Sequence, residues 1–208
     1  LNPMQTHARI SALRAASDMD IEFHGHNDLG MATANTVAAF LAGADCASVT
    51  VTGLGERAGN APLEEVATAL SRSADIDTGL DIKRFTELSE QVAHASDRRL
   101  RWDKPVTGPG SFTHESGIHC SGLMAHRTSY EVLSPEEVGM TPPEYVIGRH
   151  SGARALIHAA HRLGIEIADA RANQLLLLVR EEAIQLGRAF TEDELQFFLQ
   201  SKLKHEAS

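Results

Sequence analysis

The sequence predicts an α/β fold in its first half and a mainly helical second half. Two strand patterns, Ile21–His26 and Ala47–Thr52, each pass through a polar or glycine-rich turn into a helix pattern. Strand–helix–strand–helix order at this spacing indicates a βαβ unit with parallel strands and a right-handed crossover. Two parallel strands need neighbours and cover on both faces. We therefore expect the last two βα units of an α/β barrel, with earlier strands upstream of Leu1.

The first half begins with a helix pattern. Asn2 suits an N-cap and Pro3 suits the first helical position. Ile10, Leu13 and Ala16 then form a modest apolar stripe, which we expect to pack inward. Further helices are predicted after each strand and beyond, at 33–41, from Pro62 onward, and at 81–95.

A linker with two prolines and the only tryptophan, Trp102, separates the two halves at 98–110. The predicted division is therefore 1–97 for the barrel part and 98–208 for the linker and helical subdomains. Helices in the second half are predicted to begin at Ser134 and to cover 153–163, 169–186 and 191–203, the last with Thr191 and Glu194 at capping-box spacing. An alternative, a mostly helical domain with one βαβ insertion, leaves the paired histidines and the glycine loop unexplained.

The composition excludes several classes of protein. A net charge of -9 without Lys/Arg clusters argues against a nucleic-acid surface. No apolar run reaches membrane-spanning length, and we expect no membrane partner. Cys46 and Cys120 are too few for a disulfide framework, and no signal peptide is visible. These observations favour a cytoplasmic, reducing compartment.

The first strand carries a polar face that suggests metal chemistry. Alternate strand residues share a face, so Glu22, His24 and His26 point one way, and Ile21 and Phe23 the other. Polar groups on a buried strand are costly unless something binds them. Two imidazoles at this spacing reach a single cation, although a pair of exposed loop histidines is the simpler alternative. They lie at the carboxyl end of a strand that is followed by a helix, where α/β barrels have their active sites. This position favours an active-site role over a pair of exposed loop histidines.

The second strand leads into a glycine loop, residues 53–62. Glycines let the backbone approach a ligand closely, and the next helix offers N–H groups to an anion. The pattern is not a dinucleotide fingerprint, because the third glycine position is missing. A tight structural turn would account for the glycines but not for Glu56, Arg57 and Asn60 together.

Four motifs resemble those of one enzyme family. They are His24–Gly30, Gly53–Ala61, Phe112–His119 and Ile147–Gly152, in family order along nearly the whole chain. The chain resembles the C-terminal portion of the homocitrate, 2-isopropylmalate and citramalate synthases, which are TIM-barrel metalloenzymes. The run Phe-Thr-His-Glu-Ser-Gly-Ile-His is most similar to the homocitrate synthases that serve nitrogen fixation. The resemblance implies the last two βα units of a TIM barrel, followed by a mainly helical C-terminal region.

The resemblance also implies a site. His24 and His26 would ligate a divalent metal (Mg, Mn or Zn), with Asn60 as a weaker ligand, while an acidic ligand of the first barrel strand is not in this sequence. His119 would be the base that removes a proton from acetyl-CoA, supplied across a homodimer interface, and Tyr130 would reach the same site. We also expect substrate contacts from four residues of the two strand ends: Glu22, Gly53, Gly55 and Arg57.

The activity expected from the resemblance is an acyl transfer. Acetyl-CoA and 2-oxoglutarate would give homocitrate by metal-assisted Claisen condensation and thioester hydrolysis, with isopropylmalate or citramalate synthesis as the alternative. The chain alone is expected to be inactive, because a ligand and the earlier strands are missing. A different class also fits, a non-catalytic module that pairs with a separate N-terminal half-barrel.

Overall fold

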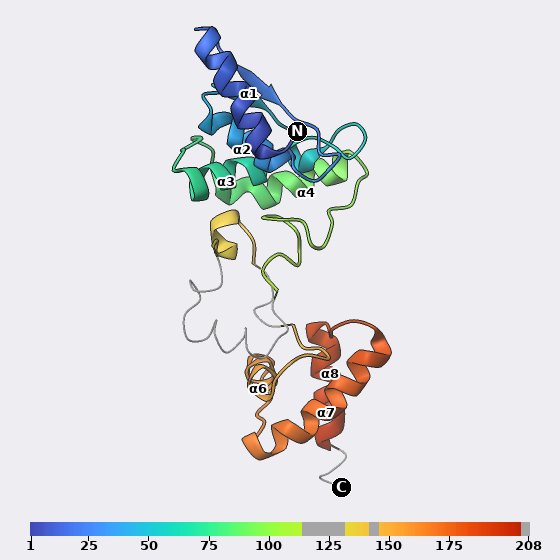
Figure 1. Cartoon of the computed structure of the whole chain (residues 1–208). Helices are drawn as coiled ribbons and strands as arrows, with labels where there is room; N and C mark the ends of the chain where they lie inside the picture. Colours follow the sequence, from blue (N-terminus) through green and yellow to red (C-terminus); the bar gives the residue numbers. More distant parts are fainter. Residues whose placement is uncertain (114–131, 142–145, 205–208) are drawn as a thin grey trace. The chain divides into compact units, whose positions relative to one another are not determined.

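The computed structural model describes residues 1–113, 132–141 and 146–204 (Figure 1). The chain divides into two compact units, one made of Leu1–Ser111 and Ser134–Thr141, the other of Phe112–Leu133 and Pro142–Ser208. The two residues predicted to be catalytic, His119 and Tyr130, lie outside the described residues.

The first unit contains the predicted βαβ unit. Strands β1 (Glu22–His24) and β2 (Cys46–Ser48) pair in parallel, with Glu22 opposite Cys46 and His24 opposite Ser48. They form the two-stranded sheet of the described residues, which are otherwise mostly helical. The other elements of this unit are α1 (Pro3–Ala16), α2 (Ala32–Leu41), η1 (Val51–Gly53), α3 (Leu63–Ala74), η2 (Ile82–Arg84), α4 (Phe85–Ala95) and η4 (Pro135–Val138).

Helix α1 begins as predicted but packs differently. Asn2 accepts a hydrogen bond from the Gln5 N–H, and Pro3 occupies the first turn. Ile10 is buried, but the predicted inward position of Leu13 is wrong, because this side chain is 55% exposed. Its neighbour Arg14 crosses to the turn after α2 instead, where it donates to the Gly43 carbonyl and pairs with Asp45.

The second strand is shorter than its β-branched run predicts. It ends at Ser48, and the four residues that were expected to extend it, 49–52, instead lead into and begin η1. Thr52 has a φ of 60°, which no strand tolerates. The backbone turns here because Thr50 pairs with Pro62 and its N–H donates to the Ala61 carbonyl.

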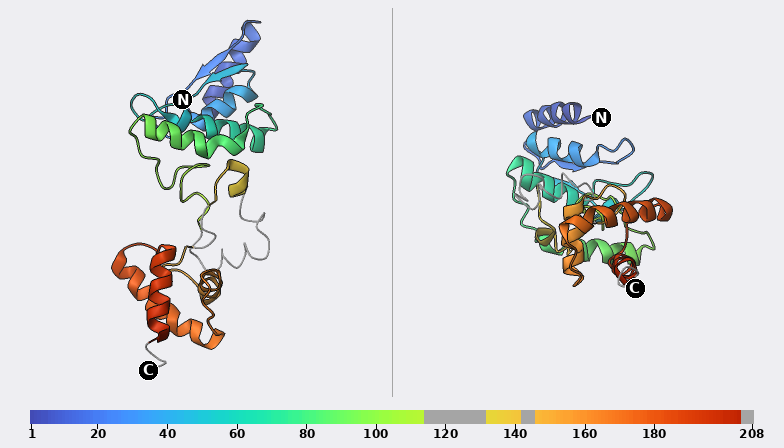
Figure 2. Two further views of the ribbon diagram at one scale, coloured as in Figure 1. Left: turned by 180° about the vertical axis from the view of Figure 1, so that it is seen from behind. Right: turned by 90° about the horizontal axis from the view of Figure 1, so that it is seen from below.

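Two small apolar clusters stabilise the first unit. Helix α2 packs against both α1 and α3 and lies between them in the right-hand view of Figure 2. Ile10 of α1 packs with three alanines of α2 and its following turn, against Ile21 and Phe23. On the other side, Val66 and Leu70 of α3 pack with Ala32 and Ala61. Alanine-rich packing lets the helices approach the sheet closely but buries little apolar area per residue.

The second unit is helical in its described part. Helices α6 (Ala153–Arg162), α7 (Asp169–Leu186) and α8 (Glu192–Lys204) start and end close to their predicted bounds. One apolar cluster runs through all three helices, and Leu156, Leu175 and Leu199 have no exposed surface. No helix in the described segments is long and apolar enough to cross a membrane.

Candidate metal centre

The polar face of β1 is present as predicted. The face is not buried as the sequence argument assumed, because Glu22 and His24 are exposed. Ile21 and Phe23 turn to the α1–α2 side and pack against its apolar cluster. This alternation follows from the period of two along a strand. His26 lies just after the strand on the same face and is half-buried.

The two histidine rings converge. His24 Nε2 and His26 Nε2 are 3.3 Å apart, and the rings lie edge to face with centroids 4.9 Å apart. His24 Nδ1 lies 3.2 Å from the Ser48 carbonyl oxygen. A carbonyl only accepts hydrogen bonds, so in neutral His24 the proton is on Nδ1 and the lone pair is on Nε2.

The separation of the two Nε2 atoms matches shared ligation. Two ligand nitrogens at about 2.0–2.1 Å from one metal, at tetrahedral or octahedral angles, are roughly 2.9–3.4 Å apart. Two bare imidazole nitrogens this close repel unless a proton or a cation lies between them. The Ser48 carbonyl, reached across the parallel pairing of β1 and β2, orients His24 as outer-shell groups orient metal-bound histidines.

Asn60 comes to the histidines through the backbone. His26 and Asn60 form an isolated antiparallel bridge, with the Asn27 N–H donating to the Gly59 carbonyl at 2.9 Å and the Ala61 N–H to the Gly25 carbonyl at 3.1 Å. The Asn60 amide nitrogen donates to the Leu54 carbonyl at 3.2 Å, which fixes the amide orientation. Asn60 Oδ1 and His26 Nδ1 are then buried without a hydrogen-bond partner among the described residues. Buried polar atoms of this kind are costly, so an oxygen ligand role for Asn60 fits the site.

The glycines of the loop hold Asn60 in place. A Cβ at Gly55 would lie 2.5 Å from Asn60 Nδ2, and one at Gly59 would lie 2.2 Å from the Gly53 carbonyl oxygen. Gly53 and Gly59 also have φ values of 75° and 91°. These positions therefore require glycine for close approach and for left-handed backbone. Their observed contacts are with Asn60 and with each other, and the substrate contacts expected of Gly53 and Gly55 remain predictions.

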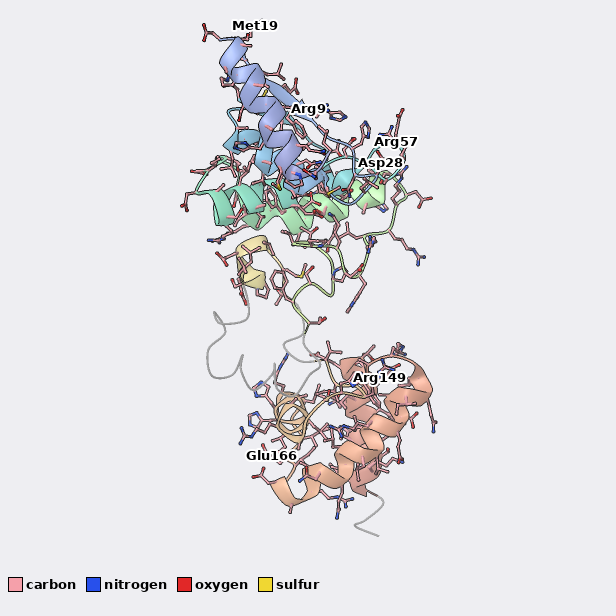
Figure 3. The ribbon with its side chains drawn as sticks, in the orientation of Figure 1. Arg9, Met19, Asp28, Arg57, Arg149 and Glu166 are labelled. Carbon is pink, nitrogen blue, oxygen red and sulfur yellow. The ribbon has the colours of Figure 1, made fainter. Side chains whose placement is uncertain are left out.

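Arg57 and Asp28 form an ion pair that sequence reasoning missed (Figure 3). Arg57 Nε donates to Asp28 Oδ1 at 2.8 Å and Nη2 to Asp28 Oδ2 at 3.1 Å. The hydrogen bonds and charge of Arg57 lower the pKa of Asp28, and Asp28 raises the pKa of Arg57. Both side chains are about half exposed. The pair joins the turn after His26 to the glycine loop and holds the guanidinium at the rim of the site.

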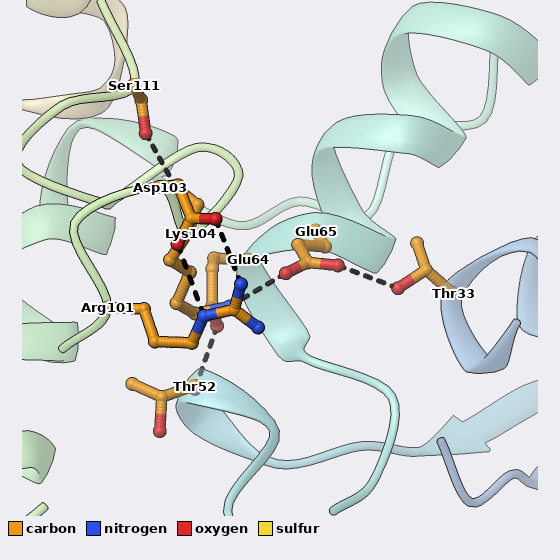
Figure 4. Close-up of polar contacts among 8 residues, drawn as sticks. All are labelled: Thr33, Thr52, Glu64, Glu65, Arg101, Asp103, Lys104 and Ser111. Atoms are coloured by element: carbon orange, nitrogen blue, oxygen red, sulfur yellow. Dashed lines mark hydrogen bonds and ion pairs between the residues drawn. The ribbon is translucent and has the colours of Figure 1, made fainter. Parts of the chain in front are cut away.

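A buried cation lies behind the glycine loop (Figure 4). Lys104 Nζ donates to Glu65 Oε1 at 2.8 Å and contacts Glu64 Oε1 at the same distance, without hydrogen-bond alignment. The other oxygen of Glu64 accepts the Thr52 N–H at 3.1 Å. The Lys104 and Glu64 side chains are only 9% and 2% exposed. The ammonium thus ties the predicted linker to the start of α3 and to the turn that precedes Gly53.

The structure brings most of the predicted site residues of the first unit to one place. The His24 and His26 rings converge, the Asn60 backbone bridges to His26, and the loop with Arg57 contains Asn60. Glu22 lies farther along β1, opposite Cys46, where partial desolvation and then the charge of Glu22 raise the pKa of the Cys46 thiol. Within the described residues no group of three or more His, Cys, Asp or Glu side chains could hold a metal, so a complete centre needs a further ligand.

Two family models match successive parts of the chain. Residues 1–92 match the HMGL-like family, and residues 106–186 match the family described as homocitrate synthase post-HMGL domain-like. The first part of the chain is thus similar to HMGL-like proteins, and the part that follows is similar to the domain that comes after the HMGL-like part in homocitrate synthases. The candidate metal centre and the glycine loop lie in the first of these parts.

Individual relatives are synthases of different names. The chain is 48% identical to 2-isopropylmalate synthase 2 of Caldanaerobacter subterraneus, over 95% of this chain and 51% of that protein. It is 41% identical to homocitrate synthase 1 of Nostoc sp., over 94% and 52%. Identity to 2-phosphonomethylmalate synthase of Streptomyces rubellomurinus is 38%, over 94% and 52%. The chain spans about half the length of these relatives.

Proposed function

We propose that this chain forms the C-terminal part of a divalent-metal acyltransferase that condenses acetyl-CoA with a 2-oxo acid. The observation that supports it best is the convergence of two Nε2 atoms 3.3 Å apart. The backbone of His26 is bridged to Asn60, whose Oδ1 has no hydrogen-bond partner within the described segments. The place of the histidine pair at the carboxyl end of β1 is where an α/β barrel carries its chemistry. In this proposal the sheet is the last two βα units of a TIM barrel, and the earlier strands complete it.

Each residue of the site has a role in this proposal. His24 and His26 hold the cation through Nε2, and Asn60 adds a weaker oxygen ligand. The cation supplies Lewis-acid polarisation of the 2-oxo acid carbonyl when bound. Arg57, held in place by Asp28, offers a guanidinium to an anionic substrate at the rim. His119 is proposed as the base that takes the methyl proton of acetyl-CoA, and Tyr130 as its neighbour, both in a homodimer whose partner subunit completes the site.

The 2-oxo acid is the finer part of the proposal. The three relatives differ in the 2-oxo acid that their names imply, while their identities to this chain span only 38–48%. We propose that the 2-oxo acid is 2-oxoglutarate and the product homocitrate, because the Phe112–His119 motif is most similar to that of homocitrate synthases. The 2-oxo acids that give 2-isopropylmalate or citramalate are the alternatives, because the pocket residues of the earlier strands decide among them.

The test is a condensation assay with the complete protein. CoA release from acetyl-CoA is followed with a thiol reagent while 2-oxoglutarate, 3-methyl-2-oxobutanoate and pyruvate are offered separately. We expect metal-dependent release with one preferred acid, and a loss of about 10²–10⁴-fold in His119→Ala. Absence of release with every acid would refute the acyltransferase and favour a non-catalytic module. The 208-residue chain alone is expected to show no release.

A further inference from the structure

In one groove of the first unit, all the charged lining residues are cations. The glycine loop forms one wall with Arg57, and the start of the predicted linker forms the other with Arg98, Arg99, Arg101 and Lys104. No acidic residue lines it, although the chain as a whole carries a net charge of -9. The sequence expectation of no Lys/Arg cluster is therefore wrong for residues 98–104, and the overall composition does not account for the groove. A cleft lined by one sign of charge concentrates ligands of the opposite sign.

Two of these cations are uncompensated. Arg57 is paired with Asp28, Arg101 with Asp103, and Lys104 with Glu64 and Glu65, which hold their side chains in place. In the described part of the chain, the exposed guanidinium groups of Arg98 and Arg99 have no ion-pair or hydrogen-bond partner. Adjacent unpaired arginines repel each other, so they favour an anion with more than one charged group.

The groove adjoins the metal centre through a shared wall. Gly53 and Gly59 line it, and the same two residues contact Asn60: the Asn60 N–H donates to the Gly53 carbonyl at 3.0 Å. A ligand in the groove thus lies against the same loop residues that hold Asn60 in place. A substrate that is long, with its reacting carbon at one end and its charge at the other, matches this placement better than a compact dicarboxylate held at the metal.

We propose that this groove binds the phosphate groups of the acyl-CoA, with Arg98 and Arg99 as the principal contacts. The inference rests on the proposed function, of which it names the substrate-binding surface. Guanidinium groups bind phosphate oxygens in bidentate fashion, and two of them engage a 3′-phosphate and a diphosphate together. The three other cations are compensated by their carboxylates, so the net attraction for an anion comes from Arg98 and Arg99.

The binding test uses the 208-residue chain and its single tryptophan. Trp102 is 60% exposed and lies between Arg101 and Lys104 in the sequence, so its fluorescence reports on the linker wall. Adenosine 3′,5′-bisphosphate, inorganic diphosphate and 2-oxoglutarate are titrated separately at low and high salt. We expect the two phosphate probes to bind, more weakly at high salt, and 2-oxoglutarate not to compete with them. Binding of 2-oxoglutarate in place of the phosphates would overturn the proposal.

Two double variants distinguish binding at the groove from general electrostatic attraction to the protein. Arg98→Gln with Arg99→Gln is expected to weaken binding of the bisphosphate about tenfold or more, since each lost charge-assisted contact is substantial. Arg9→Gln with Arg84→Gln removes the same charge from exposed positions of α1 and η2, and should leave binding unchanged. An equal loss in both double variants, or none in the first, would refute the groove.

A kinetic split in the complete protein gives a second, independent test. The Arg98→Gln/Arg99→Gln variant should raise the KM for acetyl-CoA about tenfold, while the KM for a short acetyl thioester without phosphates stays constant. A parallel change for both thioesters would contradict phosphate binding. The fluorescence titration needs no turnover, so the two proposals can fail separately. Bisphosphate binding without condensation activity would count against the proposed function alone. Condensation activity without bisphosphate binding would count against the groove alone.

Discussion

The two units of the chain are stabilised in different ways. The second unit has one continuous apolar cluster of large residues, among them Leu156, Leu175 and Leu199. The first unit has two small clusters rich in alanine. Among the described residues, every buried side-chain nitrogen or oxygen without a hydrogen-bond partner lies in the first unit, and none lies in the second.

The difference fits the metal centre that we propose in the first unit. Buried polar groups without partners cost free energy, and proteins keep them where a ligand or another surface uses them. His26 Nδ1 and Asn60 Oδ1 are two such atoms at the proposed metal centre. The second unit has no comparable cost in its described part, which fits a helical unit that folds by apolar packing.

The largest expected effect is loss of the metal. In the complete protein, His24→Ala or His26→Ala should abolish tight binding of a divalent metal, whereas Asn60→Ala should weaken it less, because imidazole is the better ligand for a borderline cation. Metal content by elemental analysis checks this, with His7→Ala on the exposed face of α1 as the matched control. Full metal content in both histidine variants would refute the proposed metal centre in the first unit.

Breaking the buried ion cluster should destabilise the first unit next most strongly. Lys104→Met leaves Glu64 buried and uncompensated, at a cost of about 3–5 kcal/mol in the free energy of unfolding. Urea unfolding with hydrogen exchange should place the loss in the first unit. Lys83→Met, at an exposed position, is the control. If Lys104→Met with Glu64→Gln is no more stable than Lys104→Met alone, the buried charge is not the cause.

One substitution made in both units sharpens the comparison. Gly59 has a φ of 91°, and a Cβ at this position would lie 2.2 Å from the Gly53 carbonyl oxygen. Gly59→Ala should therefore lower the free energy of unfolding by about 3 kcal/mol or more. Gly187, at the end of α7, has a φ of 68°, and a Cβ there would meet open space. Gly187→Ala should lower the free energy of unfolding by only about 1 kcal/mol. Chemical unfolding measures both. Equal costs would mean that backbone conformation alone, and not the packing of the loop, sets the effect.

The smallest expected effect is a pH dependence of the second unit. Arg188, with Thr191, lowers the pKa of Glu194 to about 2. The ionised carboxylate therefore stabilises the folded state above the ordinary glutamate pKa, and this contribution is lost as the pH falls toward 2. Urea midpoints of the wild type should decline over that range, and Glu194→Gln should reduce the decline. An unchanged pH profile in the variant would rule out this pair as a contributor.

Much of the local structure follows from the sequence alone. The period of two in Ile21–His26 determined which side chains share the histidine face, and the parallel pairing followed from the βαβ spacing. Asn2 and Thr191 mark the starts of α1 and α8 because their side chains cap N–H groups only three residues away. The pairing of His24 with His26 also depends on near neighbours along one strand.

Contacts between distant residues were decided only by the tertiary structure. Sequence patterns did not predict that Asn60 bridges to His26, that Asp28 holds Arg57, or that Lys104 of a Pro/Gly-rich linker is buried against α3. Nor did the β-branched run after Ser48 show that the chain turns at Thr52. Propensity and periodicity depend on neighbours within a few residues along the chain. These contacts instead join distant segments that packing brings together. There a polar side chain is buried only where the fold places a hydrogen-bond or ion-pair partner beside it.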